Sequence, residues 1–172
     1  MPGRLPILSG KPIRVRIQPE LTASGGMLLS RGKRGTPVHA GCFIRKRIIT
    51  LESDLISKPS EFDRILVHEL HHFIWARLAN AARRSFEETI EAESSTGELG
   101  WSAESMKQKL TAGDRSRRST RWRVYACESF CDTGAWYYSS LRKHSEWTLA
   151  QASRRKRAAW FREYFDGRIV SI

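Results

Sequence analysis

The chain has 172 residues and carries 30 lysine and arginine side chains against 18 aspartate and glutamate side chains, a formal net charge of +12. This length and a normal share of apolar residues are those of one globular domain, residues 1–172, with a buried core. No apolar run is as long as a membrane span, and the first residues lack the apolar stretch of a secretory signal, so we expect a soluble, cytoplasmic protein with no membrane partner.

Residues 1–55 have the pattern of strands and loops. Isoleucine and valine alternate with arginine over residues 13–17, which predicts an edge strand with one buried face. The segment 38–51 predicts one or two further strands. Its last part, residues 48–51, is a candidate edge on which an extended peptide could add as a further strand.

A helix is predicted from about residue 60 to residue 82. Ser60 is a good N-cap with Asp63 three residues later, close to a capping box, and Pro59 precedes it. An apolar stripe at helical spacing would pack on the core. The stripe consists of Phe62, Leu66, Leu70, Phe73 and Ile74.

The centre of this helix contains an H-E-x-x-H motif formed by His68, Glu69 and His72. At about 100° per residue, the two histidines lie one turn apart and about 40° apart around the axis, so both rings can reach one metal ion. Glu69 lies about 60° further round and can reach a water on that ion without being a ligand. The motif is typical of zinc hydrolases, although it also arises by chance on amphipathic helices. We expect His71 to face a pocket wall or solvent rather than to be a third histidine ligand.

Helices are also predicted over most of the remaining chain. We expect them near residues 84–95, 102–110, 121–142 and 147–165. Strands followed by helices over residues 60–165 give an α+β fold. Aromatic residues at helical spacing in 160–165 predict core packing rather than a platform for stacked bases.

The helix predicted at 121–142 carries Glu128 and Asp132 one turn apart on one face. Two acids in this position in a basic protein could form ion pairs with nearby arginines at the surface. Together with H-E-x-x-H, however, this E-x-x-x-D arrangement resembles the second motif of the gluzincin-type zinc metallopeptidases. The resemblance covers residues 60–141. The chain departs from it in lacking an obvious strand motif that holds the substrate backbone and a later histidine matched to the oxyanion.

The resemblance implies a zincin-like fold and a Zn²⁺ cofactor. It makes His68, His72 and Glu128 the metal ligands, Glu69 the general base, and Asp132 the acid that orients a ligating histidine, here His68. The last role agrees with general metal-site chemistry, because a metal-bound histidine nearly always donates its other ring N–H to a carboxylate or carbonyl.

Other side chains near these motifs have two interpretations. Tyr125 projects to the face of Glu128 and Asp132, which makes it a candidate group near the oxyanion, with core packing as the alternative. His144 is a second candidate, and Trp75, one turn beyond His72, could line the site.

Three cysteines without C-x-x-C spacing indicate neither a disulfide framework nor a zinc knuckle. Cys127 and Cys131 flank Glu128, so a thiolate ligand is an alternative to their being buried apolar thiols, as is also expected of Cys42.

Two basic runs, residues 115–121 and 154–157, could bind phosphates. Charged loops and solvated helix faces are common, and no nucleic-acid recognition motif accompanies these runs. We therefore expect a peptide or protein substrate rather than nucleic acid.

These patterns predict a zinc-dependent hydrolase, specifically a metallopeptidase with Glu69 as general base. Two alternatives remain open. One is a nucleic-acid-associated basic protein with a structural zinc site, and the other is a non-catalytic, partner-binding relative of metallopeptidases.

Overall fold

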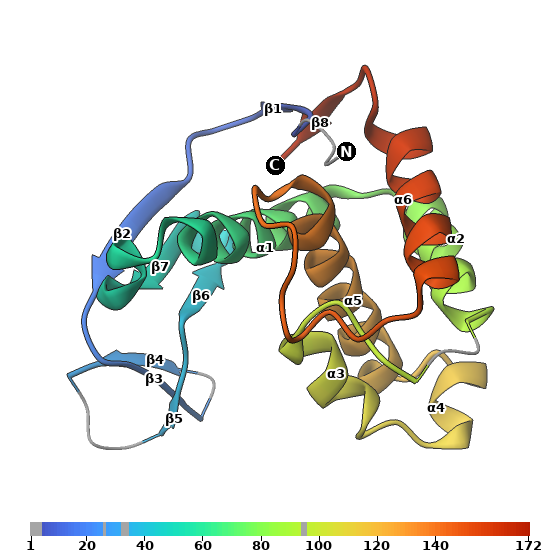
Figure 1. Ribbon diagram of the computed structural model, residues 1–172, viewed down its shortest axis with the longest axis horizontal. Helices are drawn as coiled ribbons and strands as arrows, with labels where there is room; N and C mark the ends of the chain where they lie inside the picture. Colours follow the sequence, from blue (N-terminus) through green and yellow to red (C-terminus); the bar gives the residue numbers. More distant parts are fainter. Residues whose placement is uncertain (1–4, 26, 32–34, 94–95) are drawn as a thin grey trace.

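The structure is a computed structural model that describes residues 5–25, 27–31, 35–93 and 96–172. Within these residues, small N-terminal β-sheets precede a mainly helical region of six helices, so the expected α+β class is confirmed (Figure 1). The helices are α1 (Pro59–Arg77), α2 (Asn80–Glu91), α3 (Trp101–Lys107), α4 (Ala112–Ser116), α5 (Thr120–Tyr138) and α6 (Gln151–Phe165). The strands are β1 (Ile7–Ser9), β2 (Arg14–Gln18), β3 (Leu21–Ser24), β4 (Met27–Ser30), β5 (Thr36–Pro37), β6 (Ala40–Phe43), β7 (Ile48–Glu52) and β8 (Ile169–Ser171). None of the helices described here is long and apolar enough to span a bilayer.

Several predicted helix ends were wrong. Ser60 does not cap α1: Lys58 is the N-cap residue, without a side-chain hydrogen bond, and Pro59 occupies the first turn. Asp63 instead accepts a hydrogen bond from the backbone N–H of Ser140. α2 begins at Asn80 rather than near 84, and residues 94 and 95, at its predicted end, lie outside the described residues. The short helix α4 was not predicted, although Thr111 and Asp114 form its capping box.

The described strands form three small sheets rather than the one that was expected. The largest has the order β2-β7-β6, with β2 parallel and β6 antiparallel to β7. β7 is therefore the central strand, and the prediction that residues 48–51 form a free edge is wrong. β2 is an edge strand, but it has no buried face, because Val15 is 45% and Ile17 is 40% exposed.

The other two sheets connect distant or peripheral segments. β3 pairs with β4 and β5 in an antiparallel sheet at one end of the molecule. β8, which the sequence did not predict, pairs in parallel with β1. The N- and C-terminal segments consequently lie together above α1 (Figure 1).

α1 lies between the strands and the other long helices (Figure 1), and it packs in both directions. Toward the sheet, Phe73 and Ile65 join Ile49 and Leu51 of β7 in one core cluster. Toward the helices, Val67 and Ile74 join the cluster built from α2, α5 and α6, in which the aromatic residues of α6 pack as predicted. α1 thus buries two sides, where the sequence predicted one apolar stripe.

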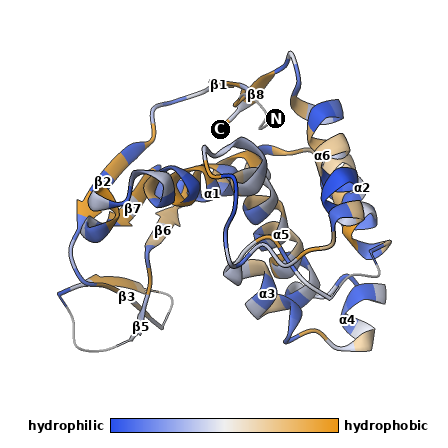
Figure 2. Ribbon diagram, viewed as in Figure 1, coloured by the Kyte–Doolittle hydropathy of each residue, from blue (hydrophilic) through white to orange (hydrophobic). Residues whose placement is uncertain are grey.

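Arg157 of α6 is fully buried and pairs with two glutamates. Its guanidinium contacts Glu93 at 2.7 Å and Glu98 at 2.9 Å. The basic run 154–157 is therefore not one continuous cationic surface. Figure 2 shows the alternation of hydrophilic and hydrophobic residues along α6 that gives this helix a buried and an exposed side.

His71 packs at the contact between α1 and α5, and the expectation that it faces a pocket wall or solvent is wrong. Its side chain is 0% exposed, and its Nδ1 donates to the carbonyl of Val67 at 2.7 Å. Burial lowers the pKa of His71 to about 4, so the ring is neutral. A Cβ atom on Gly134 would lie 2.3 Å from the ring, so only glycine fits opposite this histidine.

We expect Gly134→Ala to lower the free energy of unfolding by about 1–3 kcal/mol, the usual cost of overpacking a core. Alanine is the better helix former by about 1 kcal/mol, so a net loss would show that the interhelical contact dominates. Chemical denaturation measures the effect. In a His71→Ala background the same change should cost less, because the ring is gone. An unchanged stability of the single variant would contradict this account of the α1–α5 contact.

Candidate metal centre

Two long helices bring the residues of the candidate centre together. α1 supplies His68 and His72, and α5 supplies Glu128 and Asp132. The Nε2 atom of His68 lies 3.5 Å from Oε2 of Glu128, and Nε2 of His72 lies 3.8 Å from the same oxygen. One carboxylate oxygen of Glu128 therefore lies near a ring nitrogen of each histidine.

Asp132 holds the other nitrogen of His68. Its Oδ1 lies 2.8 Å from His68 Nδ1, and its Oδ2 accepts the backbone N–H of Ala103 at 2.9 Å. A Cβ atom on Gly100 would lie within 2.5 Å of three atoms of this carboxyl group. The carboxylate is thus fixed in the first turn of α3, and it directs the Nε2 of His68 toward Glu128.

Cys127 takes the corresponding position beside His72. Its Sγ lies 3.5 Å from His72 Nδ1. A hydrogen bond from Cys131, acting against burial, lowers the pKa of the Cys127 thiol to about 6. Both histidines therefore have Nδ1 bound to a partner on α5 and Nε2 turned toward Glu128.

The electrostatics of the centre favour a negatively charged Glu128. Burial alone would raise the pKa of Glu128, but the hydrogen bond with His68 and the charges of both imidazoles outweigh burial and lower it. Burial would likewise lower the pKa of His68, whereas Asp132 and Glu128 raise it well above its usual value. A cation at this point would replace the imidazole protons as partner of the carboxylate.

Two of the donor separations can be compared with those of a zinc site. In a tetrahedral site with bonds of about 2.0–2.2 Å, donor atoms lie about 3.3–3.6 Å apart. The separations of 3.5 and 3.8 Å from Glu128 to the two imidazoles are close to this range. His68, His72 and Glu128 are also side chains that zinc accepts, and each is partly exposed (11%, 17% and 22%).

Cys131 gives a second ligand set. One donor atom each of His68, His72 and Cys131 lie within 4.8 Å of one another. The Cys131 thiol is fully buried, and burial together with its hydrogen bond to Cys127 raises its pKa well above the usual value. Zinc binds the thiolate rather than the thiol, so Cys131 would have to lose its proton on metal binding, whereas Glu128 is already charged.

Glu69 lies beside the centre and contacts the first sheet. Its carboxylate lies beside the thiol of Cys42 on β6, and donor atoms of these two residues and His72 lie within 4.8 Å of one another. Burial and the negative charge of Glu69 raise the pKa of Cys42, which keeps this thiol neutral. Glu69 is thus held between the imidazoles and the β6 strand.

A cleft of about 330 Å³ opens beside this centre, with His68 among its lining residues but neither His72 nor Glu128. Its walls include His68, Glu69 and Asp132, the segment 36–40 that leads into β6, and Trp101 of α3. At its rim, Arg64 pairs with Glu61 and Glu146, and Glu146 also accepts the backbone N–H of Trp101.

Three other residues named from the sequence lie elsewhere. The Tyr125 hydroxyl donates to Glu98 at 2.5 Å inside the core. Tyr125 therefore packs in the core, which was the alternative prediction, and is not a group near the oxyanion. Trp75 packs on Phe86 and Phe130 rather than on the cleft. His144 is bound to Glu61 at 3.1 Å, at the rim.

The sequence did not indicate three of the supporting contacts, namely Cys127 beside His72, Cys42 beside Glu69, and the N-terminus of α3 around Asp132. The position of Cys127 directly before Glu128 was a usable signal of its closeness to the site, although adjacent helical residues point about 100° apart. Searches against models of known families, curated proteins and solved structures find no match for this chain.

We expect Asp132→Asn to weaken zinc affinity by roughly 10–100-fold, the usual effect of losing the carboxylate that orients a ligating histidine. Zinc titration with a competing chelator measures the affinity. Glu146→Gln is the matched control, because this acid lines the same cleft without contacting His68. Equal affinities in the parent and both variants would show that Asp132 has no part in metal binding.

Proposed function

We propose that the protein is a zinc-dependent hydrolase with a zincin-like fold, and specifically a metallopeptidase. One observation carries the proposal. Two histidines, each with Nδ1 bound on α5, turn Nε2 toward one charged glutamate, and His68 and Glu69 line an open cleft beside them. Three protein ligands would leave a fourth position for water, as a catalytic rather than a structural centre requires, and Glu69 lies beside it.

In this proposal His68, His72 and Glu128 hold the zinc ion, and Asp132 and Cys127 orient the two imidazoles. When bound, the ion supplies an acidified water and a positive charge next to the substrate carbonyl. Glu69 accepts a proton from the attacking water and passes it to the leaving nitrogen. Cys42 keeps the Glu69 carboxylate in place, and its own neutral thiol adds no charge to the site.

A peptide substrate is supported by the strand next to the cleft. β6 lies at the edge of its sheet, and the segment 36–40 that leads into it lines the cleft beside Glu69. An extended peptide can add to such an edge through main-chain hydrogen bonds. We infer that β6, and not the central strand β7, receives the substrate.

The metal ligands are tested by substitution. We expect one zinc ion per chain in the parent and in Cys131→Ala, and none in His72→Ala or Glu128→Ala, because three protein ligands hold a catalytic zinc. Metal content after dialysis measures this, with circular dichroism to check the fold. Loss of zinc in Cys131→Ala and retention in Glu128→Ala would show that Cys131, and not Glu128, is the third zinc ligand.

The catalytic role is tested separately on Glu69. Glu69→Gln should keep the zinc ion and lower the rate of peptide hydrolysis by at least about 100-fold, the usual contribution of a general base. Cleavage of a mixed peptide library, followed by mass spectrometry, detects turnover without a known substrate. Metal-dependent cleavage that survives in Glu69→Gln would remove this residue from the mechanism. Bound zinc without cleavage in the parent would favour a structural metal.

A further inference from the structure

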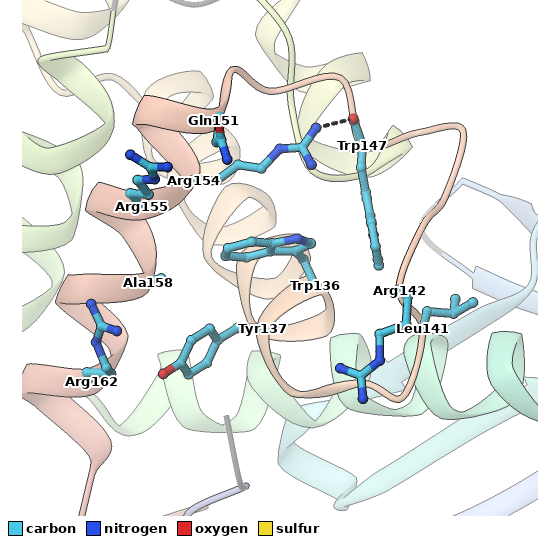
Figure 3. Close-up of a pocket in the computed structure, with 10 residues that line it drawn as sticks. All are labelled: Trp136, Tyr137, Leu141, Arg142, Trp147, Gln151, Arg154, Arg155, Ala158 and Arg162. Carbon is cyan, nitrogen blue, oxygen red and sulfur yellow. Dashed lines mark hydrogen bonds between the residues drawn. The ribbon is translucent and has the colours of Figure 1, made fainter. Parts of the chain in front are cut away.

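A second pocket, of about 430 Å³, lies between the end of α5, the segment 139–150 that follows it, and α6 (Figure 3). It shares no lining residue with the cleft at the metal centre. Its volume lies within the range of about 300–1,000 Å³ that is usual for small-molecule sites. Nothing in the proposed hydrolysis uses it.

The wall of this pocket is strongly cationic. It contains Arg142, Arg154, Arg155 and Arg162 and no acidic side chain. None of these four arginines forms an ion pair with any residue that the structure describes, in contrast to the buried Arg157. Arg154 donates to the backbone carbonyls of Leu149 and Trp147, which fixes its guanidinium without neutralising the charge.

The arginines of α6 are arranged around a gap. Arg155, Ala158 and Arg162 follow one another at helical spacing and line the same pocket. Arg155 and Arg162 are exposed, and Ala158 between them has only a methyl group, so no large side chain stands between the two arginines on this face of α6. Asp166 is an acid near this wall. Burial and the negative charge of Asp166 raise the pKa of Tyr137, and the positive charge of Arg162 acts in the opposite direction.

Aromatic side chains complete the pocket. In Figure 3 the indole of Trp136 lies at the centre, with Arg154 and Tyr137 on either side of it. Trp147 forms another wall. Its indole is 8% exposed, and its buried Nε1 has no hydrogen-bond partner among the described residues. Flat apolar faces therefore lie beside several unpaired cations.

We propose that this pocket binds a nucleoside phosphate, with the base stacked on Trp136 and the phosphate held by Arg155 and Arg162. Guanidinium groups bind phosphate through paired, charge-assisted hydrogen bonds. An aromatic ring adds stacking energy for any base. An anion without a planar ring would leave the aromatic wall unused, and an uncharged aromatic ligand would leave the arginines unpaired.

The test compares three probes on the full-length protein at low salt by isothermal titration calorimetry. They are inorganic phosphate, adenosine monophosphate and a ten-residue oligodeoxyadenylate. We expect adenosine monophosphate to bind about tenfold or more tightly than phosphate, because stacking of a base is worth roughly 1–3 kcal/mol. An oligonucleotide that binds tenfold better still would identify a nucleic-acid strand as the source of the nucleotide, and equal affinities would identify the free nucleotide.

The matched variants separate a built site from general charge. The double variant Arg155→Gln/Arg162→Gln should lose tenfold or more in affinity for adenosine monophosphate. Lys156→Gln/Arg168→Gln removes the same charge from exposed positions outside the pocket and should change the affinity by less than twofold. Trp136→Leu should abolish the preference for adenosine monophosphate over inorganic phosphate, and Trp136→Phe should retain most of it. Thermal unfolding checks that each variant is folded.

Three results would overturn the proposal. They are equal affinities for phosphate and adenosine monophosphate, equal losses in the two double variants, and no binding of any probe at low salt. If Trp136→Leu does not fold, the comparison of the two double variants still tests whether Arg155 and Arg162 hold the phosphate. The preference of the parent protein for adenosine monophosphate over inorganic phosphate still tests whether the pocket binds the base.

Discussion

The candidate metal centre depends on the close approach of α1 and α5, and the packing of His71 against Gly134 permits that approach. His71 lies between His68 and His72 in the chain, and Gly134 lies two residues after Asp132. A side chain at position 134 would overlap the imidazole ring. The contact therefore fixes how far apart the helices lie and which turn of α1 faces Glu128.

The side chains of the centre are then oriented by a series of contacts that begins outside it. The first turn of α3 surrounds the Asp132 carboxylate through the N–H of Ala103 and the close backbone at Gly100. Asp132 in turn fixes the Nδ1 of His68. Such contacts are made in a buried environment, where hydrogen bonds are strong and a lost partner is costly. The geometry at Glu128 is consequently set before any metal binds.

The parts of this arrangement that follow from local periodicity could be predicted from the sequence. The spacing of His68, Glu69 and His72 on one helix needs no tertiary information, and neither does the pairing of Glu128 with Asp132 on another. The errors concern which surface a helix or strand buries. Tyr125 has the right helical phase, but Glu98, from a segment with no periodic pattern, binds its hydroxyl. β7 is a central strand because β2, whose residues lie 34 positions earlier than their partners, pairs with it in parallel.

The arginine pocket shows the same dependence on long-range contacts. The run 154–157 looks uniform in sequence, but α6 rotates Arg157 into the core to meet Glu93 and Glu98, and leaves Arg154 and Arg155 on the pocket side. The segment 139–150 then forms a wall of both sites, with Glu146 at the metal cleft and Trp147 at the pocket. Backbone N–H groups of Thr148 and Leu149 donate to the carbonyl of Glu98, which anchors this segment to the core. Since that anchor lies immediately after Trp147, substitutions on the exposed face of α6 can alter the pocket while the metal centre keeps its geometry.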